Sequence, residues 1–93
     1  MSAKKYTDSF IVINEKGLHT RPSTELVKCA SSFKSRVSLQ FQDLNVNAKS
    51  LLGILMLAAA RGSKIVVEAV GEDSEEAVKS ILELANNKFH IKY

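Results

Sequence analysis

The sequence predicts a single α+β domain over residues 1–93, in which helices cover one face of an antiparallel or mixed sheet. Three observations predict this class. Segments with a strand pattern and segments with a helix pattern alternate in the order βαββαβα. The predicted strands carry many polar residues, as expected for a sheet with one face in solvent. A chain of 93 residues has room for one small domain and not for two.

The first part of the chain predicts a strand, a tight turn and a long helix. Residues 6–13 are rich in β-branched and aromatic residues, which favours a strand. Residues 14–17 end in Gly17, which can take the positive φ of a turn. Apolar residues then recur at helical spacing from residue 20 to residue 33. Pro22 fits the first turn of this helix because its missing N–H is not needed there.

The rest of the chain predicts three further strands and two helices. Alternating apolar and polar residues indicate a hairpin of two half-buried strands, residues 37–41 and 44–48. A short apolar helix, a strongly β-forming run and a last helix follow, over residues 51–57, 65–70 and 73–85. Asp73 and Glu76 have the spacing of a capping box for that last helix. From residue 86 onward the helical pattern frays.

Charge and aromatic content narrow the classes of partner. The formal net charge is +3, and the cations are scattered along the chain rather than clustered. This distribution fits acidic protein partners or ordinary solubility better than nucleic acid. The chain has four Phe, two Tyr and no Trp, which is a poor supply of base-stacking side chains. A small nucleic-acid-binding module is therefore the weaker alternative.

Cysteine content and hydropathy exclude other classes. Cys29 is the single cysteine, so the sequence offers neither an internal disulfide nor a cysteine pair for a metal. No apolar run approaches the ~20 residues of a membrane span, and no secretory signal is evident. A domain of this size also lacks the walls of a deep substrate cleft. We expect a cytoplasmic domain without metal, cofactor or membrane insertion, with its chemistry at the surface.

The segment Gly17-Leu18-His19-Thr20-Arg21-Pro22 is the most informative part of the chain. It places His19 at the start of the predicted helix, where Ser, Thr, Asp or Asn would be the preferred cap. The free N–H groups of a helix start, here around Thr20, and the guanidinium of Arg21 both suit a phosphate. The same positive groups disfavour a protonated imidazole and keep it nucleophilic. From these residues alone, an anion-accepting histidine and a plain surface histidine are equally good interpretations.

This segment resembles the active-site signature of the HPr family, the phosphocarriers of the bacterial phosphoenolpyruvate-dependent sugar phosphotransferase system. A second block, residues 49–57, resembles the regulatory-serine region of that family, and the resemblance extends from residue 6 to residue 89. It implies an open-faced β-sandwich with a four-stranded antiparallel sheet. It also implies that Enzyme I phosphorylates His19 on Nδ1, that Arg21 stabilises the phosphoryl group, and that IIA domains of sugar permeases receive it. The protein would be a phosphoryl-transfer intermediate and a monomer, rather than an enzyme acting on a small substrate.

Ser50 and the leucines that follow it form a second candidate site. The resemblance implies phosphorylation of Ser50 by an HPr kinase/phosphorylase, whereas its ordinary role would be to cap the short helix. Leu51, Leu52 and Leu55 lie at helical spacing, and if exposed they would mark a protein contact site, with a core position as the alternative. The resemblance implies that this segment docks partners beside the histidine. A second functional interpretation keeps phosphorylation of His19 but makes the protein mainly a regulatory signalling partner without sugar transport.

Four features depart from the family pattern or have no role in it. Ser23 stands where the family usually has alanine. His90 lacks an Arg-Pro context and is expected to be a bystander. Cys29 lies on the apolar side of its helix and is expected to be a small buried hydrophobe. Residues 89–93 have no predicted role.

Overall fold

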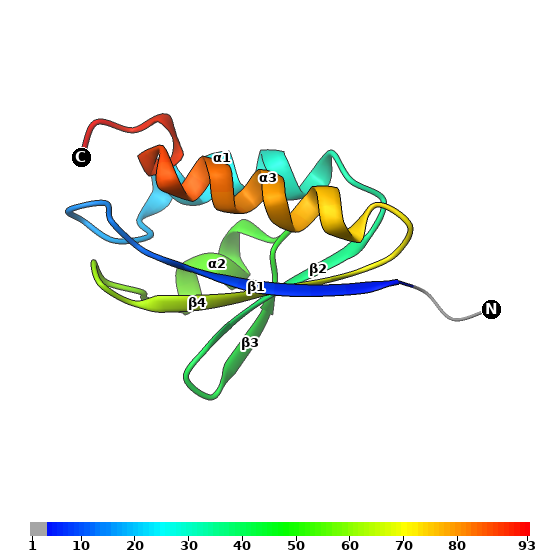
Figure 1. Ribbon diagram of the computed structural model, residues 1–93. Helices are drawn as coiled ribbons and strands as arrows, with labels where there is room; N and C mark the ends of the chain where they lie inside the picture. The colour runs from blue at the N-terminus through cyan, green and yellow to red at the C-terminus, as the bar shows by residue number, and fades with distance from the viewer. Residues whose placement is uncertain (1–3) are drawn as a thin grey trace.

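The computed structural model describes residues 4–93, which form one four-stranded sheet covered by helices. The elements are β1 (Lys5–Ile11), α1 (Thr20–Ser31), β2 (Arg36–Phe41), β3 (Leu44–Asn47), α2 (Leu51–Met56), β4 (Lys64–Val70), α3 (Ser74–Asn86) and the 3₁₀ helix η1 (Lys88–His90). The predicted βαββαβα order is therefore confirmed, with η1 added. Figure 1 shows α1 and α3 on one side of the sheet, with the opposite face uncovered. No helix within residues 4–93 is long and apolar enough to cross a membrane.

The sheet has the strand order β1-β4-β2-β3, and each neighbouring pair is antiparallel. The central strand β4 alternates strictly, with Ile65, Val67 and Ala69 buried and its other residues at least partly exposed. Ile65 pairs with the buried Phe10 of β1, and Val67 pairs with the buried Leu39 of β2. The register thus gathers the apolar side chains on the face that the helices cover. The expectation of an open-faced α+β fold with a four-stranded antiparallel sheet is confirmed.

Each helix contributes one apolar face to the core. From α1 and α3 the buried residues include Leu26, Ala30, Ala77, Val78 and Ile81, all at helical spacing. Helix α2 contributes Ile54 and packs against α1 and β3. Helix α1 in turn packs against α2, α3 and η1.

The first strand and the first helix both end two residues earlier than predicted. β1 ends at Ile11 rather than at residue 13, because Val12 bonds instead to the loop before β4, donating its N–H to Ser63 and accepting from Gly62. α1 ends at Ser31 rather than at Phe33. Ser32 and Phe33 donate to carbonyls three residues back, at 3.1 and 3.2 Å, which tightens the last turn out of α geometry.

The predicted capping box at the start of α3 was wrong. Asp73 does occupy the N-cap position, but its side chain makes no hydrogen bond to the helix. Its carboxylate instead accepts hydrogen bonds from the Lys34 N–H, the Ser35 N–H and the Ser35 hydroxyl, just before β2. The carboxylate is thus used to join two parts of the fold that are far apart in sequence.

The expectations for Cys29 and for the chain after residue 86 were also wrong. Cys29 is partly exposed rather than buried, and its partial burial still raises the pKa of the thiol. The chain does not fray at residue 87, because η1 follows and Phe89 is completely buried in the core. Residues 1–3 lie outside the described part of the chain.

Candidate functional site

His19 occupies the N-cap of α1, as the sequence predicts. Its backbone is extended, with φ −77° and ψ −171°, and its carbonyl accepts the first helical hydrogen bond from the Ser23 N–H at 3.1 Å. The imidazole does not cap the helix. Because Pro22 has no N–H, the N–H groups of Thr20 and Arg21 are the ones that this helix start offers to an external acceptor.

The departure at Ser23 has a local explanation. Ser23 is completely buried, and its hydroxyl donates to the Leu18 carbonyl at 2.9 Å. This bond ties the first turn of α1 to the residue before His19. The serine therefore keeps its polar atom satisfied and does not disturb the helix start.

The loop before His19 is fixed against the loop that follows α2. Gly17 has φ +69°, and the Leu18 N–H donates to the Ala59 carbonyl at 2.9 Å. A hollow of about 390 Å³ lies where these loops meet, lined by Lys16, Leu18, His19, Thr20, Leu55, Ala58, Ala59 and Ala60. We call it the His19 hollow. It is open to solvent.

The two ring nitrogens of His19 differ in their surroundings. Nε2 is buried and has no hydrogen-bond partner among residues 4–93. Nδ1 is not confined in this way and is the nitrogen that a reactant from solvent can approach.

Two cations contact Tyr93, whose ring lies beside the imidazole. The exposed Arg21 does not line the His19 hollow but turns to Tyr93, whose hydroxyl accepts a hydrogen bond from Nη1 at 2.8 Å. The Tyr93 ring lies 5.9 Å from the His19 ring, centroid to centroid, and Lys16 Nζ lies 4.9 Å from the Tyr93 centroid. Sequence reasoning found Arg21 but missed Lys16 and Tyr93. Lys16 could have been found as a cation three residues before the histidine, whereas nothing local marks Tyr93.

Ser50 caps α2. Its side-chain oxygen accepts a hydrogen bond from the Gly53 N–H at 3.1 Å, which confirms the capping role. The exposed apolar surface on α2 consists of Leu52, Met56 and Leu51, exposed by 71, 66 and 37%. Leu55 is half-buried and lines the His19 hollow. The structure thus places Leu55 at the His19 hollow and exposes Leu51 and Leu52, as predicted. It adds Met56 to this exposed surface, which its helical spacing from Leu52 could have indicated.

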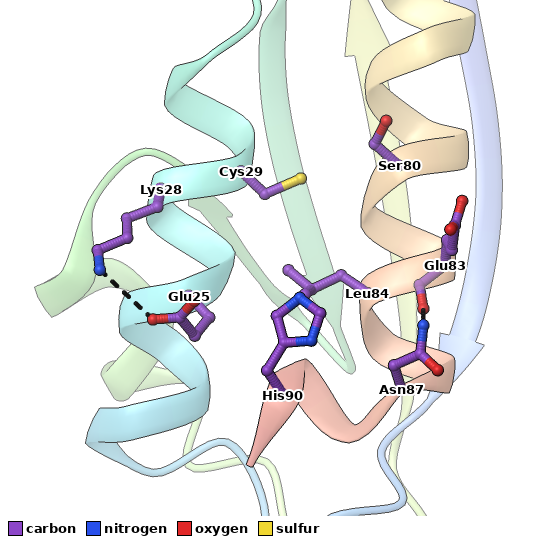
Figure 2. Close-up of a pocket in the computed structure, with 8 residues that line it drawn as sticks. All are labelled: Glu25, Lys28, Cys29, Ser80, Glu83, Leu84, Asn87 and His90. Atoms are coloured by element: carbon purple, nitrogen blue, oxygen red, sulfur yellow. Dashed lines mark hydrogen bonds and ion pairs between the residues drawn. The ribbon is translucent and has the colours of Figure 1, made fainter.

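A second cavity of about 450 Å³ lies between α1 and α3 (Figure 2). It shares no lining residue with the His19 hollow. Its walls include Cys29, Ser80 and Leu84, with His90 from the chain beyond α3. The Glu25 carboxylate pairs with Lys28 at its rim, at 3.5 Å. Residues 4–93 contain no group of three or more His, Cys, Asp or Glu side chains that could hold a metal ion.

Comparisons with known proteins agree over most of the chain. A family model described as the PTS HPr component phosphorylation site matches residues 6–87. The phosphocarrier protein HPr of Neisseria meningitidis is 43% identical over 81 residues, covering 87% of this chain and 91% of the relative. The crystal structure of HPr-C-His from Thermoanaerobacter tengcongensis matches with a TM-score of 0.89 and 34% identity, covering 95% of this chain and 99% of that one. A crystal structure described as an HPr dimer from the same organism matches with a TM-score of 0.74 and 38% identity, covering 86 and 92%.

Proposed function

The chain belongs to the HPr family of phosphocarrier proteins, and from this premise we propose that His19 accepts a phosphoryl group from phosphorylated Enzyme I and passes it to IIA domains of sugar permeases. The observation that carries the proposal is the placement of His19. It stands at a helix start that no side chain caps, with one ring nitrogen buried and the other open. A helix start of this kind favours bound phosphate.

The transfer uses the Nδ1 lone pair as nucleophile. Nδ1 attacks the phosphorus, an N–P bond forms, and the bond from phosphorus to the donor group on Enzyme I breaks, with its electron pair left on that donor. For this step the neutral ring must carry its proton on the other nitrogen, Nε2, which is buried. In the second step a nucleophile on the IIA domain attacks the same phosphorus, and Nδ1 recovers its lone pair.

The residues around Nδ1 stabilise the phosphoryl oxygens. The Thr20 and Arg21 N–H groups point out of the helix start, where the helix dipole is positive. The Arg21 guanidinium offers a planar set of further donors. No acid stands in the first turn of α1, so no carboxylate there repels the incoming group.

Partner docking is proposed for the exposed apolar surface of α2. Helix α2 carries Leu51, Leu52 and Met56 on its exposed surface and reaches the His19 hollow through Leu55. An apolar surface beside the reactive group is the feature expected of a protein contact site. Most of its free energy should come from a few such side chains.

Ser50 is proposed as a regulatory phosphorylation site for an HPr kinase/phosphorylase. Its hydroxyl stands at the start of α2, directly before Leu51 and Leu52. A phosphate there would add about −2 charge at the edge of the docking surface and hinder partners that approach through acidic groups. Comparing Ser50→Asp with Ser50→Asn tests this, since both can cap a helix and only Asp is charged. Slower uptake from Enzyme I in Ser50→Asp alone would support regulation.

The second candidate function is that of a regulatory signalling partner without sugar transport. It shares the phosphorylated His19 and differs in the recipient. Incubating the phosphorylated protein with the IIA domains of its own organism separates the two. Transfer to any IIA domain supports transport, and no transfer to any of them supports regulation.

The proposed carrier chemistry is tested by labelling from phosphoenolpyruvate through Enzyme I. We expect the wild type to acquire an acid-labile, alkali-stable label that is absent from His19→Ala. His90→Asn is the matched control, because it removes the other histidine and asparagine tolerates the φ of 62° at that position. Label on His19→Ala, or no label on the wild type, would contradict the proposal.

A further inference from the structure

The chain reverses direction after α3. Lys88, Phe89 and His90 have φ values of 54, 55 and 62°, a run of left-handed conformations in side chains that rarely adopt them. Such backbone persists only where the surrounding structure determines it. Phe89 supplies that structure, because it is completely buried and meets Phe10 edge-on at a centroid distance of 5.9 Å.

Asn14 fixes both ends of the segment that follows. Its side chain is completely buried, and Nδ2 donates to the Lys88 carbonyl at 2.9 Å and to the Tyr93 carbonyl at 3.1 Å. Asn14 also belongs to the turn before His19, where its own carbonyl accepts from the Gly17 N–H at 3.0 Å. Residues 88–93 are therefore anchored to the same turn that positions the histidine. We call this segment the strap.

The strap ends with its aromatic ring among the groups of the His19 site. The Tyr93 hydroxyl accepts from Arg21 Nη1 at 2.8 Å, and the guanidinium carbon lies 5.8 Å from the ring centroid. Lys16 Nζ lies 4.9 Å from the same centroid, and the His19 ring lies 5.9 Å away at a tilt of 37°. One side chain thus contacts both cations and the imidazole.

We propose that Tyr93 is a positioning residue for the phosphotransfer of the proposed function: it holds the Arg21 guanidinium and the Lys16 ammonium beside His19, ready for the phosphoryl group. Both cations are exposed and carried on long side chains, which would otherwise sample many rotamers in water. The guanidinium has five N–H groups and gives one to Tyr93, so the rest stay available to phosphoryl oxygens. Tyr93 lies beyond residues 6–87, which the family model matches, so family membership assigns it no such role.

Two substitutions separate the hydroxyl from the ring. Tyr93→Phe keeps the face that attracts the cations and loses the hydrogen bond, whereas Tyr93→Leu loses both. We expect Tyr93→Leu to slow phosphoryl uptake from Enzyme I about two- to fivefold, the factor that corresponds to an exposed cation–π contact, and Tyr93→Phe to slow it less. The ¹⁵N relaxation of the Arg21 Nε–H should report a more mobile guanidinium in both variants, which a purely structural role would leave unchanged.

Tyr6→Phe is the matched control, because Tyr6 lies in β1 opposite Ala69 and has no contact with the His19 site. It should transfer and relax like the wild type. No label on the wild type would overturn this inference together with the proposed function. If the wild type is labelled and Tyr93→Leu takes up the phosphoryl group as fast as the wild type or faster, the inference alone is overturned. If Tyr93→Leu does not fold, Tyr93→Phe decides instead: an Arg21 guanidinium no more mobile than in the wild type would overturn the inference.

Discussion

At the scale of single residues, Gly17 sets where the histidine stands. Its φ of +69° is a left-handed value, and a Cβ built there would lie 2.3 Å from the Ala59 carbonyl oxygen and 2.9 Å from Ala60 Cα. Both are backbone atoms, so neither can rotate away. We expect Gly17→Ala to lower the free energy of unfolding by more than the roughly 1–2 kcal/mol that a left-handed L residue costs. Urea unfolding followed by circular dichroism measures the loss.

Gly62→Ala separates the two contributions. Gly62 also has a positive φ, +92°, yet a Cβ there would meet no atom of residues 4–93 within 4 Å. This variant should show the backbone cost without the collision. If Gly17→Ala were no less stable than Gly62→Ala, the close contact between the two loops would not be a significant constraint on His19.

Residue types that act locally could be predicted from the sequence, and those that act at a distance could not. His19 and Pro22 were placed correctly at the helix start because capping and proline rules depend on neighbours in sequence. Tyr93 reaches the site through three consecutive positive φ values and a clamp from Asn14. No rule based on local sequence predicts this reversal of the chain at residues 88–90, so the contact of Tyr93 with Arg21 and Lys16 was missed.

At the scale of elements, α2 presents an apolar face that the fold does not use. Leu52 and Met56 are exposed by 71 and 66% and are four residues apart, on one side of the helix. If partners dock there, Leu52→Ser should raise the KM for phosphorylated Enzyme I about tenfold, equivalent to about 1.4 kcal/mol, and leave kcat nearly unchanged. Steady-state phosphorylation kinetics distinguish the two parameters.

The hairpin between β2 and β3 provides a matched control for this surface. Leu44 is 46% exposed at the start of β3, and Leu44→Ser removes an exposed leucine from an element other than α2. It should leave the KM for Enzyme I unchanged. An equal rise in both variants would mean that α2 is not the docking element.

The start of α3 is joined to the start of β2 through Asp73. Hydrogen bonds from the Ser35 hydroxyl and from the Lys34 N–H lower the pKa of the Asp73 carboxyl from 3.8 to about 2. A lowered pKa means that the native state favours the ionised form, so the stabilisation is complete above pH ~4. It is lost as the pH falls from about 4 to about 2. We expect Asp73→Asn to be less stable than the wild type at pH 7, with the difference shrinking across that acid range.

Urea midpoints at pH 7, 4 and 2 test this dependence. Glu76→Gln serves as the comparison, because Glu76 was predicted to complete a capping box that the structure does not contain. The Asp73→Asn difference should be the larger one at pH 7. A wild-type advantage over Asp73→Asn that persisted unchanged to pH 2 would show that the carboxylate charge is not what stabilises this junction.

At the scale of the whole molecule, the order of elements could be predicted but their pairing could not. Periodicity within the sequence distinguishes strand from helix, so βαββαβα was accessible. The order β1-β4-β2-β3 places β4 between two strands that are distant from it in sequence. That choice depends on which buried faces fit together, as Ile65 does with Phe10 and Val67 with Leu39. The resemblance to a known family, rather than the pattern itself, supplied the four-stranded sheet in advance.

Phe89 connects the core to the candidate site. Its ring is fully buried against Phe10 of β1, and the strap that carries Tyr93 to the site begins at the residue before it. We expect Phe89→Ala to cost about 3–5 kcal/mol, as for other buried aromatic truncations. Phe33→Ala, at a half-buried position, should cost less. Urea unfolding gives both values.

Weakening the packing of Phe89 should also change phosphoryl uptake at the His19 site. Domains of this kind are stable by about 5–15 kcal/mol, so Phe89→Leu is the safer variant for work on the folded protein. Because Phe89 anchors the reversal of residues 88–90, this variant should release Tyr93 from Arg21 and reproduce the slower phosphoryl uptake expected of Tyr93→Leu. In the double variant Phe89→Leu/Tyr93→Leu the uptake rate should fall no further than in Tyr93→Leu alone. Additive losses would instead mean that Phe89 affects phosphotransfer by a route other than the strap.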